Sequence, residues 1–199
     1  MEDSIRDRIR KKIASGKKGM IYFPSDFMEY GNVESVKKAL FRLEESGFLK
    51  RLAHGIYLYP KNDKLLGVLY PSMEEIASVI AKRDKARIMP TGVHALNKLG
   101  LSTQVPTKVV YLTDGSPRSI KVGKRSLNFK KTTPKNLSTK GEISSLVIQG
   151  LREIGQGHLT KQDLSRIKDL LSKEKPELIK YDASLAPAWI REIMLENLS

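Results

Sequence analysis

The spacing of apolar residues in the first sixty positions restricts the fold of this chain more than any other feature. Ile5, Ile9 and Ile13 recur every fourth residue among charged residues, which predicts a helix with one apolar face. Ser15-Gly16 is expected to end that helix. Residues 19–23 are apolar and β-prone, so a short strand is expected between the first helix and Pro24.

Two helices in succession are expected next. The residues from Pro24 onward suit the start of a short helix, and Asn32 is placed to cap a longer helix over residues 33–46. Ser46-Gly47 provides its C-terminal stop. The apolar positions of the longer helix recur at helical spacing and predict its buried face: Val36, Ala39, Leu40 and Leu43.

Two short strand-forming runs follow, over residues 48–52 and 56–59. Ala53-His54-Gly55 predicts a tight turn between them. In the second run Tyr57 and Tyr59 alternate with Ile56 and Leu58. We therefore expect one of these pairs to be buried and the other to face solvent.

The order helix, strand, helix, helix, strand, turn, strand is typical of a winged helix-turn-helix. In such a fold the second helix of the pair enters the major groove of DNA, and the hairpin contacts the backbone or the minor groove. The side chains that would read DNA lie opposite the apolar stripe: Ser35, Lys37, Lys38 and Arg42. The hairpin, or wing, adds Lys50, Arg51 and His54. The alternative is an ordinary solvated helix face and a turn histidine.

The charge of the chain favours a polyanionic partner. The formal net charge is +14, and the excess is concentrated in residues 61–140, which contain 16 Lys and Arg against 5 Asp and Glu. Cations that neutralise phosphates release condensed counterions, so a basic surface of this size indicates nucleic acid. A basic surface without a partner is the alternative.

Beyond residue 60 we expect a connector over residues 61–71, anchored by Leu65, Leu66, Val68 and Leu69. Residues 72–199 then predict a second domain with a small sheet and a helical C-terminal tail, so the whole chain is α+β. Helices are expected over residues 73–85, 92–99, 142–155, 160–172, 176–181 and 187–198. Strands are expected over residues 87–89, 108–113, 119–122 and 126–130.

The last two of these strands form a strongly cationic hairpin around Gly123-Lys124. One face of it could contact phosphates, through Arg118, Lys121, Lys124, Arg125, Lys130 and Lys131, with Lys135 close behind in sequence. The alternative is a sheet edge protected by lysines against pairing with other chains.

The sequence offers little for catalysis. It contains no cysteine, which excludes disulfides and thiolate chemistry, and His54, His94 and His158 lack the spacing of metal ligands. Neither a Gly-Lys-Ser/Thr phosphate-binding loop nor a nucleophile elbow is present. We therefore expect no catalytic residue, no metal, no cofactor and no enzyme activity; a nuclease built from scattered carboxylates and lysines is the alternative.

The N-terminus also bears on location. It is charged from Glu2 onward, and no apolar run reaches the length of a signal peptide or a membrane span. This predicts a soluble, cytoplasmic protein.

Several segments together resemble the AbiEi-type antitoxins of type IV toxin–antitoxin systems. They are R-L-A-H-G-I-Y at residues 51–57, P-T-G-V-H-A-L-N-K-L-G-L at 90–101, T-K-V-V-Y-L-T-D-G at 107–115 and L-A-P-A-W-I-R-E at 185–192. The resemblance covers nearly the whole chain and corresponds to a compact branch of the family. It implies a two-domain repressor whose winged helix binds inverted repeats in its own promoter. Its counterpart would be a nucleotidyltransferase-like toxin, opposed without a stable complex.

The resulting expectation is a sequence-specific DNA-binding autorepressor with an antitoxin role, monomeric or weakly dimeric, that pairs on double-stranded DNA. One alternative is a protein-interaction module that docks an acidic partner or the toxin directly. Another is an RNA-binding protein. The basic sheet favours RNA, but Phe129 is the one aromatic residue there that could stack on a base.

Overall fold

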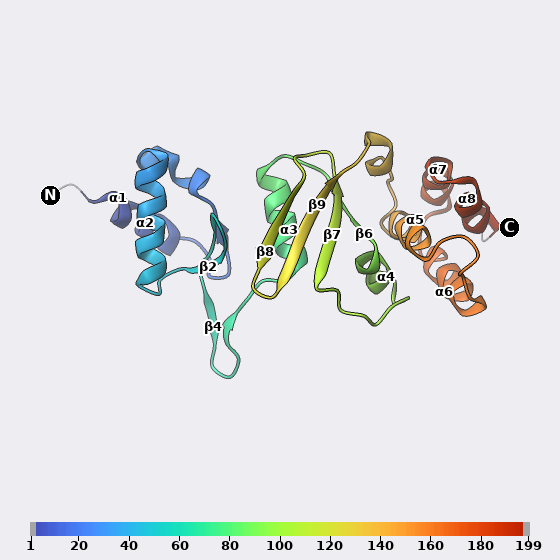
Figure 1. Ribbon diagram of the computed structural model, residues 1–199, viewed down its shortest axis with the longest axis horizontal. Coiled ribbons are helices and arrows are strands. Elements are labelled where there is room, and N and C mark those ends of the chain that lie inside the picture. The colour runs from blue at the N-terminus through green and yellow to red at the C-terminus, as the bar shows by residue number, and fades with distance from the viewer. Residues whose placement is uncertain (1–2, 197–199) are drawn as a thin grey trace. The chain divides into compact units, whose positions relative to one another are not determined.

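The structure is a computed structural model that describes residues 3–196, and its fold is mixed α+β, as expected (Figure 1). The chain divides into two compact units. The first contains residues 1–80 and 120–124, and the second contains residues 81–119 and 125–199. Leu198, the expected end of the last helix, lies outside the described residues.

The helices of the first unit begin where their capping residues predict. α1 (Ile5–Ala14) is capped by Ser4, whose side chain accepts a hydrogen bond from the Asp7 amide. α2 (Val33–Glu45) is capped by Asn32, whose Oδ1 accepts a hydrogen bond from the Ser35 amide at 2.9 Å. The short helix between them, η1 (Pro24–Tyr30), is a 3₁₀ helix.

A three-stranded antiparallel sheet completes the N-terminal part, with strand order β1-β3-β2. Its strands are β1 (Ile21–Tyr22), β2 (Lys50–Ala53) and β3 (Ile56–Leu58). One apolar core joins the helices to this sheet and consists of Ile9, Ile13, Tyr22, Phe27, Val36, Ala39, Leu40, Leu43, Leu49 and Tyr57. The observed order of elements is therefore the one expected from the sequence.

The alternation expected along β3 is wrong, because Ile56, Tyr57 and Leu58 are all buried. β3 is the central strand of its sheet and pairs on both edges, with Leu58 opposite both Ile21 and Lys50. A central strand that is covered on both faces contains apolar residues in succession, and the sequence alone does not reveal that coverage.

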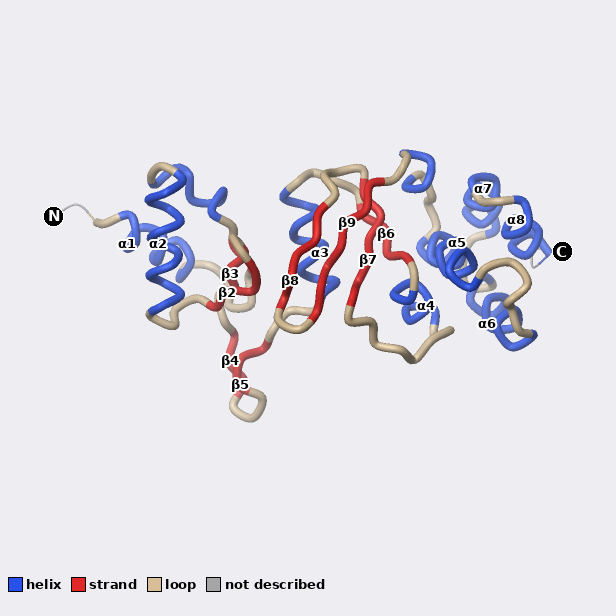
Figure 2. The backbone as a smooth tube through the Cα atoms, in the orientation of Figure 1, coloured by secondary structure: helices blue, strands red, loops and turns tan. Residues whose placement is uncertain are grey.

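The connector expected at residues 61–71 is a two-stranded hairpin of β4 (Lys61–Asp63) and β5 (Gly67–Leu69) (Figure 2). The prediction that Leu65 and Leu66 anchor this segment is wrong, since their side chains are 94% and 77% exposed. The Asp63 carboxylate accepts hydrogen bonds from both leucine amides, at 2.8 and 3.0 Å. This turn holds the two side chains at the hairpin tip, away from any core.

α3 (Met73–Arg83) follows, opened by a reciprocal pair of hydrogen bonds between Ser72 and Glu75. A four-stranded sheet has the order β6-β7-β9-β8. Its strands are β6 (Ile88–Thr91), β7 (Lys108–Thr113), β8 (Arg118–Val122) and β9 (Arg125–Lys131). β6 contains Pro90 and lies at an edge, where a residue without an amide hydrogen is tolerated. β7 and β9 are parallel, which was not expected from the sequence.

Helices make up the rest of the second unit. They are α4 (Val93–Leu99), η2 (Pro134–Leu137), α5 (Glu142–Ile154), α6 (Lys161–Leu171), α7 (Pro176–Leu185) and α8 (Ala188–Leu195). The core shared by α4, α5, α6, α7 and α8 is formed by Leu99, Val147, Ile148, Leu151, Ile167, Leu171, Ile179, Ala183, Ile190 and Met194. The helical tail expected from the sequence is therefore a packed bundle.

A buried carboxylate joins two of these helices. Asp182 on α7 is fully buried and accepts hydrogen bonds from the amides of Lys140 and Gly141, at 2.8 and 2.9 Å, and from the hydroxyl of Ser144. These donors surround the start of α5, so Asp182 caps that helix from 41 residues away in sequence. A Cβ at Gly141 would meet the Ser144 hydroxyl and the Glu174 carboxylate, so a larger residue there would displace these groups.

Replacing Asp182 with Ala leaves three donors without their acceptor. We expect it to lower the free energy of unfolding by about 2–4 kcal/mol, measured by urea denaturation. Asp169→Ala on the exposed surface of α6 is the control and should change stability by less than about 0.5 kcal/mol. Equal stability of the two variants would contradict this role for Asp182.

Candidate nucleic-acid interface

The two faces of α2 differ sharply in chemistry. Val36, Ala39, Leu40 and Leu43 are buried, whereas Lys37, Lys38 and Arg42 are exposed on the remaining surface of the helix. This division is the one predicted from the sequence. Ser35 is half-buried beside the N-cap.

The exposed cations on α2 are largely free to contact a partner. The Lys37 Nζ lies 2.9 Å from the Glu34 carboxylate, but the Lys37 side chain is 49% exposed. Such exposed ion pairs contribute little to stability, so Lys37 can readily exchange Glu34 for another anionic partner. Among the described residues, neither Lys38 nor Arg42 forms an ion pair through its side chain.

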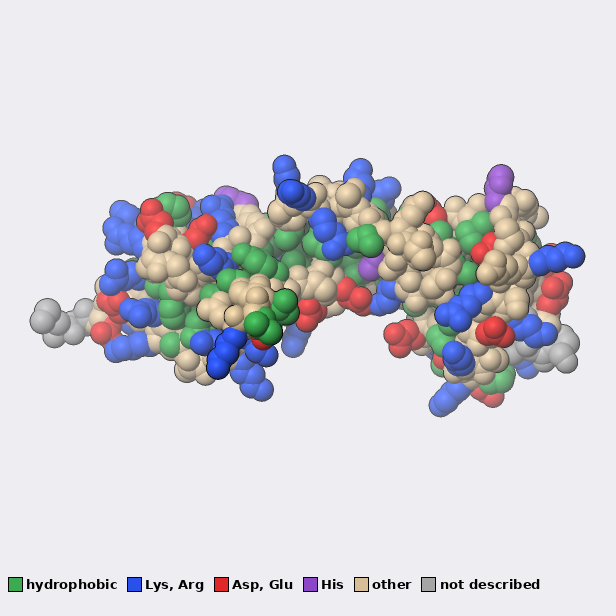
Figure 3. Space-filling model, turned by 90° about the horizontal axis from the view of Figure 1, so that it is seen from below, with side chains coloured by type: hydrophobic (Ala, Val, Ile, Leu, Met, Phe, Trp, Pro, Cys, Tyr) green, Lys and Arg blue, Asp and Glu red, His purple; other side chains and the backbone are tan. Residues whose placement is uncertain are grey.

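A groove of about 500 Å³ lies between α1 and α2, which pack against each other (Figure 1). It is lined by Ser4, Ile5, Arg6, Asp7, Ser35, Lys38, Ala39 and Arg42. Arg6 therefore joins the predicted cations; it was not predicted from the sequence because its place depends on how α1 packs. Figure 3 shows Lys and Arg side chains spread over this N-terminal part of the surface, with fewer acidic ones among them.

The groove contains one carboxylate, that of Asp7. The hydroxyl of Ser4 donates to Asp7 Oδ2 at 2.5 Å, and the Arg6 guanidinium lies 3.1 Å from Oδ1. These contacts, the Ser4 hydrogen bond first, lower the pKa of Asp7 below its ordinary value. Three cations against one anion leave the groove with a net positive charge.

The β2–β3 hairpin presents Lys50, Arg51 and His54, all exposed. Lys50 is opposite Leu58 and Arg51 is opposite Tyr57, so the two cations point to different faces of the sheet. The Arg51 Nη2 lies 3.0 Å from the His54 Nδ1. Arginine has no acceptor, so the guanidinium is the donor in this contact.

The two arginines of the cationic hairpin β8–β9 already bind groups of the protein. Arg118 pairs with Asp84, and its guanidinium lies 5.4 Å above the centre of the Phe129 ring. Although burial acts in the opposite direction, hydrogen bonds from Arg83 and Arg118 lower the pKa of Asp84 below its ordinary value. Arg125 donates to the Pro106 carbonyl at 3.3 Å.

The lysines of this region are exposed: Lys121, Lys124, Lys130, Lys131 and Lys135. Their contact with phosphate stays a prediction. Phe129 is 5% exposed and stacks on Tyr111 at 6.2 Å, so it presents no ring to a nucleic-acid base. This removes the aromatic residue on which base stacking in the RNA alternative depended.

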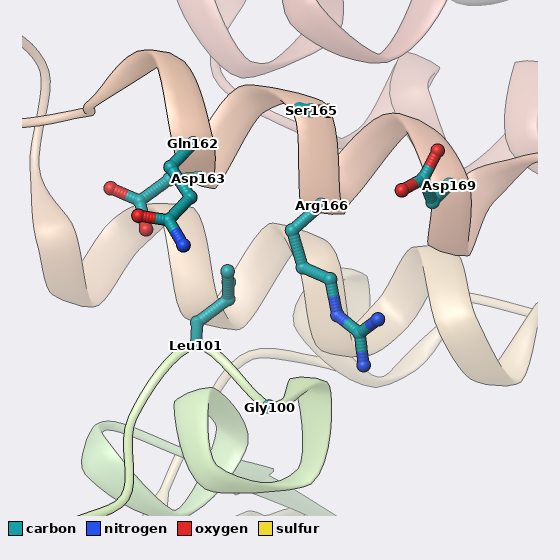
Figure 4. Close-up of a pocket in the computed structure, with 7 residues that line it drawn as sticks. All are labelled: Gly100, Leu101, Gln162, Asp163, Ser165, Arg166 and Asp169. Carbon is teal, nitrogen blue, oxygen red and sulfur yellow. The ribbon is translucent and has the colours of Figure 1, made fainter.

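Several polar side chains elsewhere in the described residues have partners within the protein. His94 Nε2 lies 3.2 Å from the Tyr111 hydroxyl. A pocket of about 390 Å³ lies between the end of α4 and α6 (Figure 4). There Arg166 donates to the Leu99 carbonyl at 3.5 Å, and the Asp163 carboxylate accepts hydrogen bonds from Thr160, the residue that caps α6. No cluster of three His, Cys, Asp or Glu side chains suited to a metal occurs within residues 3–196. Across the same residues, no helix has the length and apolar character to cross a bilayer.

Comparison with known proteins gives a family and a distant structural likeness. No curated protein matches the sequence. The crystal structure of the RV2827C protein from Mycobacterium tuberculosis is similar at 12% identity and a TM-score of 0.47, covering 97% of this chain and 81% of that chain. Residues 8–179 match the model of a family described as "Family of unknown function (DUF6088)". The chain therefore belongs to the DUF6088 family.

Proposed function

We propose that this protein binds double-stranded DNA through the face formed by α2 and the β2–β3 hairpin, used as a winged helix-turn-helix. In this arrangement α2 enters the major groove and the hairpin contacts the flanking backbone. The observation that supports this most is the exposure of Lys37, Lys38 and Arg42 opposite the buried stripe of α2.

The dimensions of the surface suit a duplex. The 13 residues of α2 span about 20 Å, and an α-helix fits the major groove, which is about 12 Å wide. The groove between α1 and α2 places Arg6 beside Lys38 and Arg42, where it could bind a phosphate next to the bases that α2 reads. Lys50 and Arg51 extend the cationic surface onto the hairpin.

The biological role that we propose is autorepression, with an antitoxin function in a type IV toxin–antitoxin system. This extension rests on the resemblance of residues 51–57, 90–101, 107–115 and 185–192 to AbiEi-type antitoxins. Inverted repeats would require two copies of the chain, paired on the DNA. The nucleotidyltransferase-like toxin would be opposed without a stable complex, in the cytoplasm.

The test compares wild type with Lys37→Ala/Arg42→Ala for binding to two duplexes, by fluorescence anisotropy over a range of salt. One duplex is selected by the wild type from a random library, and the other is the region upstream of the coding sequence. The double variant should bind about 10-fold more weakly or worse, and its salt slope should fall by about two, since two phosphate contacts are lost.

The matched control is Lys161→Ala/Lys168→Ala, which removes two exposed cations from α6. It should leave affinity and salt slope nearly unchanged. If both double variants behave alike, net charge rather than the α2 surface accounts for binding. If the wild type binds the selected duplex but not the upstream DNA, DNA binding stands and autorepression is wrong.

A further inference from the structure

Phe41 is an exception to the burial of large apolar side chains along α2. The other large apolar side chains in the middle of this helix, Val36, Leu40 and Leu43, are almost completely buried, whereas Phe41 is 47% exposed. Its ring lies on the cationic side of the helix, within one turn of Lys37, Lys38 and Arg42. Covering a half-exposed phenyl ring is favourable, so this position is suited to burial against a partner.

The neighbours of Phe41 show which part of the partner it would meet. Glu34, Lys38, Phe41 and Glu45 are spaced by four, three and four residues, and all four are exposed. At about 100° per residue they lie within an arc of roughly 60° and form a single line along the outermost surface of α2. We call this line the outer stripe. Lys37 and Arg42 lie on opposite sides of it.

The chemistry of the outer stripe suits base edges better than phosphates. Two carboxylates repel the phosphate backbone, but a carboxylate can accept hydrogen bonds from the amino group of cytosine in the major groove. Lys38 can donate to guanine O6 and N7. The 5-methyl group of thymine is the apolar group that this groove offers to a phenyl ring.

We infer that Phe41 packs on the 5-methyl group of a thymine in the major groove and thereby selects a T·A pair at one position of the site. The inference rests on the proposed function, because it requires α2 to lie in that groove. Lys37 and Arg42, on the two flanks, then face the phosphates on either side of the base pair that Phe41 reads.

The experiment uses the full-length protein and the duplex that the wild type selects from a random library. Each thymine is replaced in turn by deoxyuridine, which removes the methyl group and keeps the base pairing. At one thymine in each half-site, wild-type affinity should fall by about 4- to 10-fold. Phe41→Ala should bind the original duplex correspondingly more weakly and lose its sensitivity to that replacement.

The control variant is Phe41→Leu, which keeps an apolar side chain and should retain part of the methyl dependence. Phe41→Ala should keep the wild-type salt slope, because no charge is lost, and thermal unfolding checks that both variants are folded. If no deoxyuridine weakens wild-type binding, or if Phe41→Ala is as sensitive as wild type, the inference is wrong while DNA binding stands. If the wild type selects no duplex at all, the proposed function fails, and with it the role of Phe41.

Discussion

The burial of one face of α2 is the interaction on which the proposed interface depends. Val36, Leu40 and Leu43 lie in a core shared with Ile9 and Phe27, and each large apolar side chain contributes about 1.5–3 kcal/mol when it is buried. Turning the helix to bury its cations would lose these contributions and leave charges desolvated and unpaired. The side chains at positions 37, 38, 41 and 42 are therefore held outward by the packing of the opposite face.

Local structure was predictable because its causes are close together in sequence. Asn32 and Thr160 cap the helices that they precede, and Lys108–Thr113 is a strand with the expected bounds. Contacts between distant segments were not predictable. The parallel pairing of β7 with β9 and the capping of α5 by Asp182 depend on how the chain returns on itself, which no local pattern encodes.

The same distinction separates the side chains of the candidate site whose placement followed from the sequence from those whose placement did not. The cations of α2 followed from its periodicity, whereas Arg6 was missed because it reaches the site through the packing of α1. Arg118 was expected to be available for phosphate, but its partner Asp84 is 34 residues away in sequence. Phe41 was not among the predicted site residues, because the predicted set on α2 contained polar side chains alone. Apolar contacts also distinguish one base from another.

Lysine acetylation with and without bound duplex, read by mass spectrometry, tests the proposed DNA-binding surface most directly. The account predicts that saturating DNA protects Lys37, Lys38 and Lys50 from acetylation. It leaves Lys161 and Lys168 on α6, and Lys173 in the turn after α6, as reactive as before. Full reactivity of the three N-terminal lysines in the DNA complex would contradict it, as would protection confined to Lys130 and Lys131.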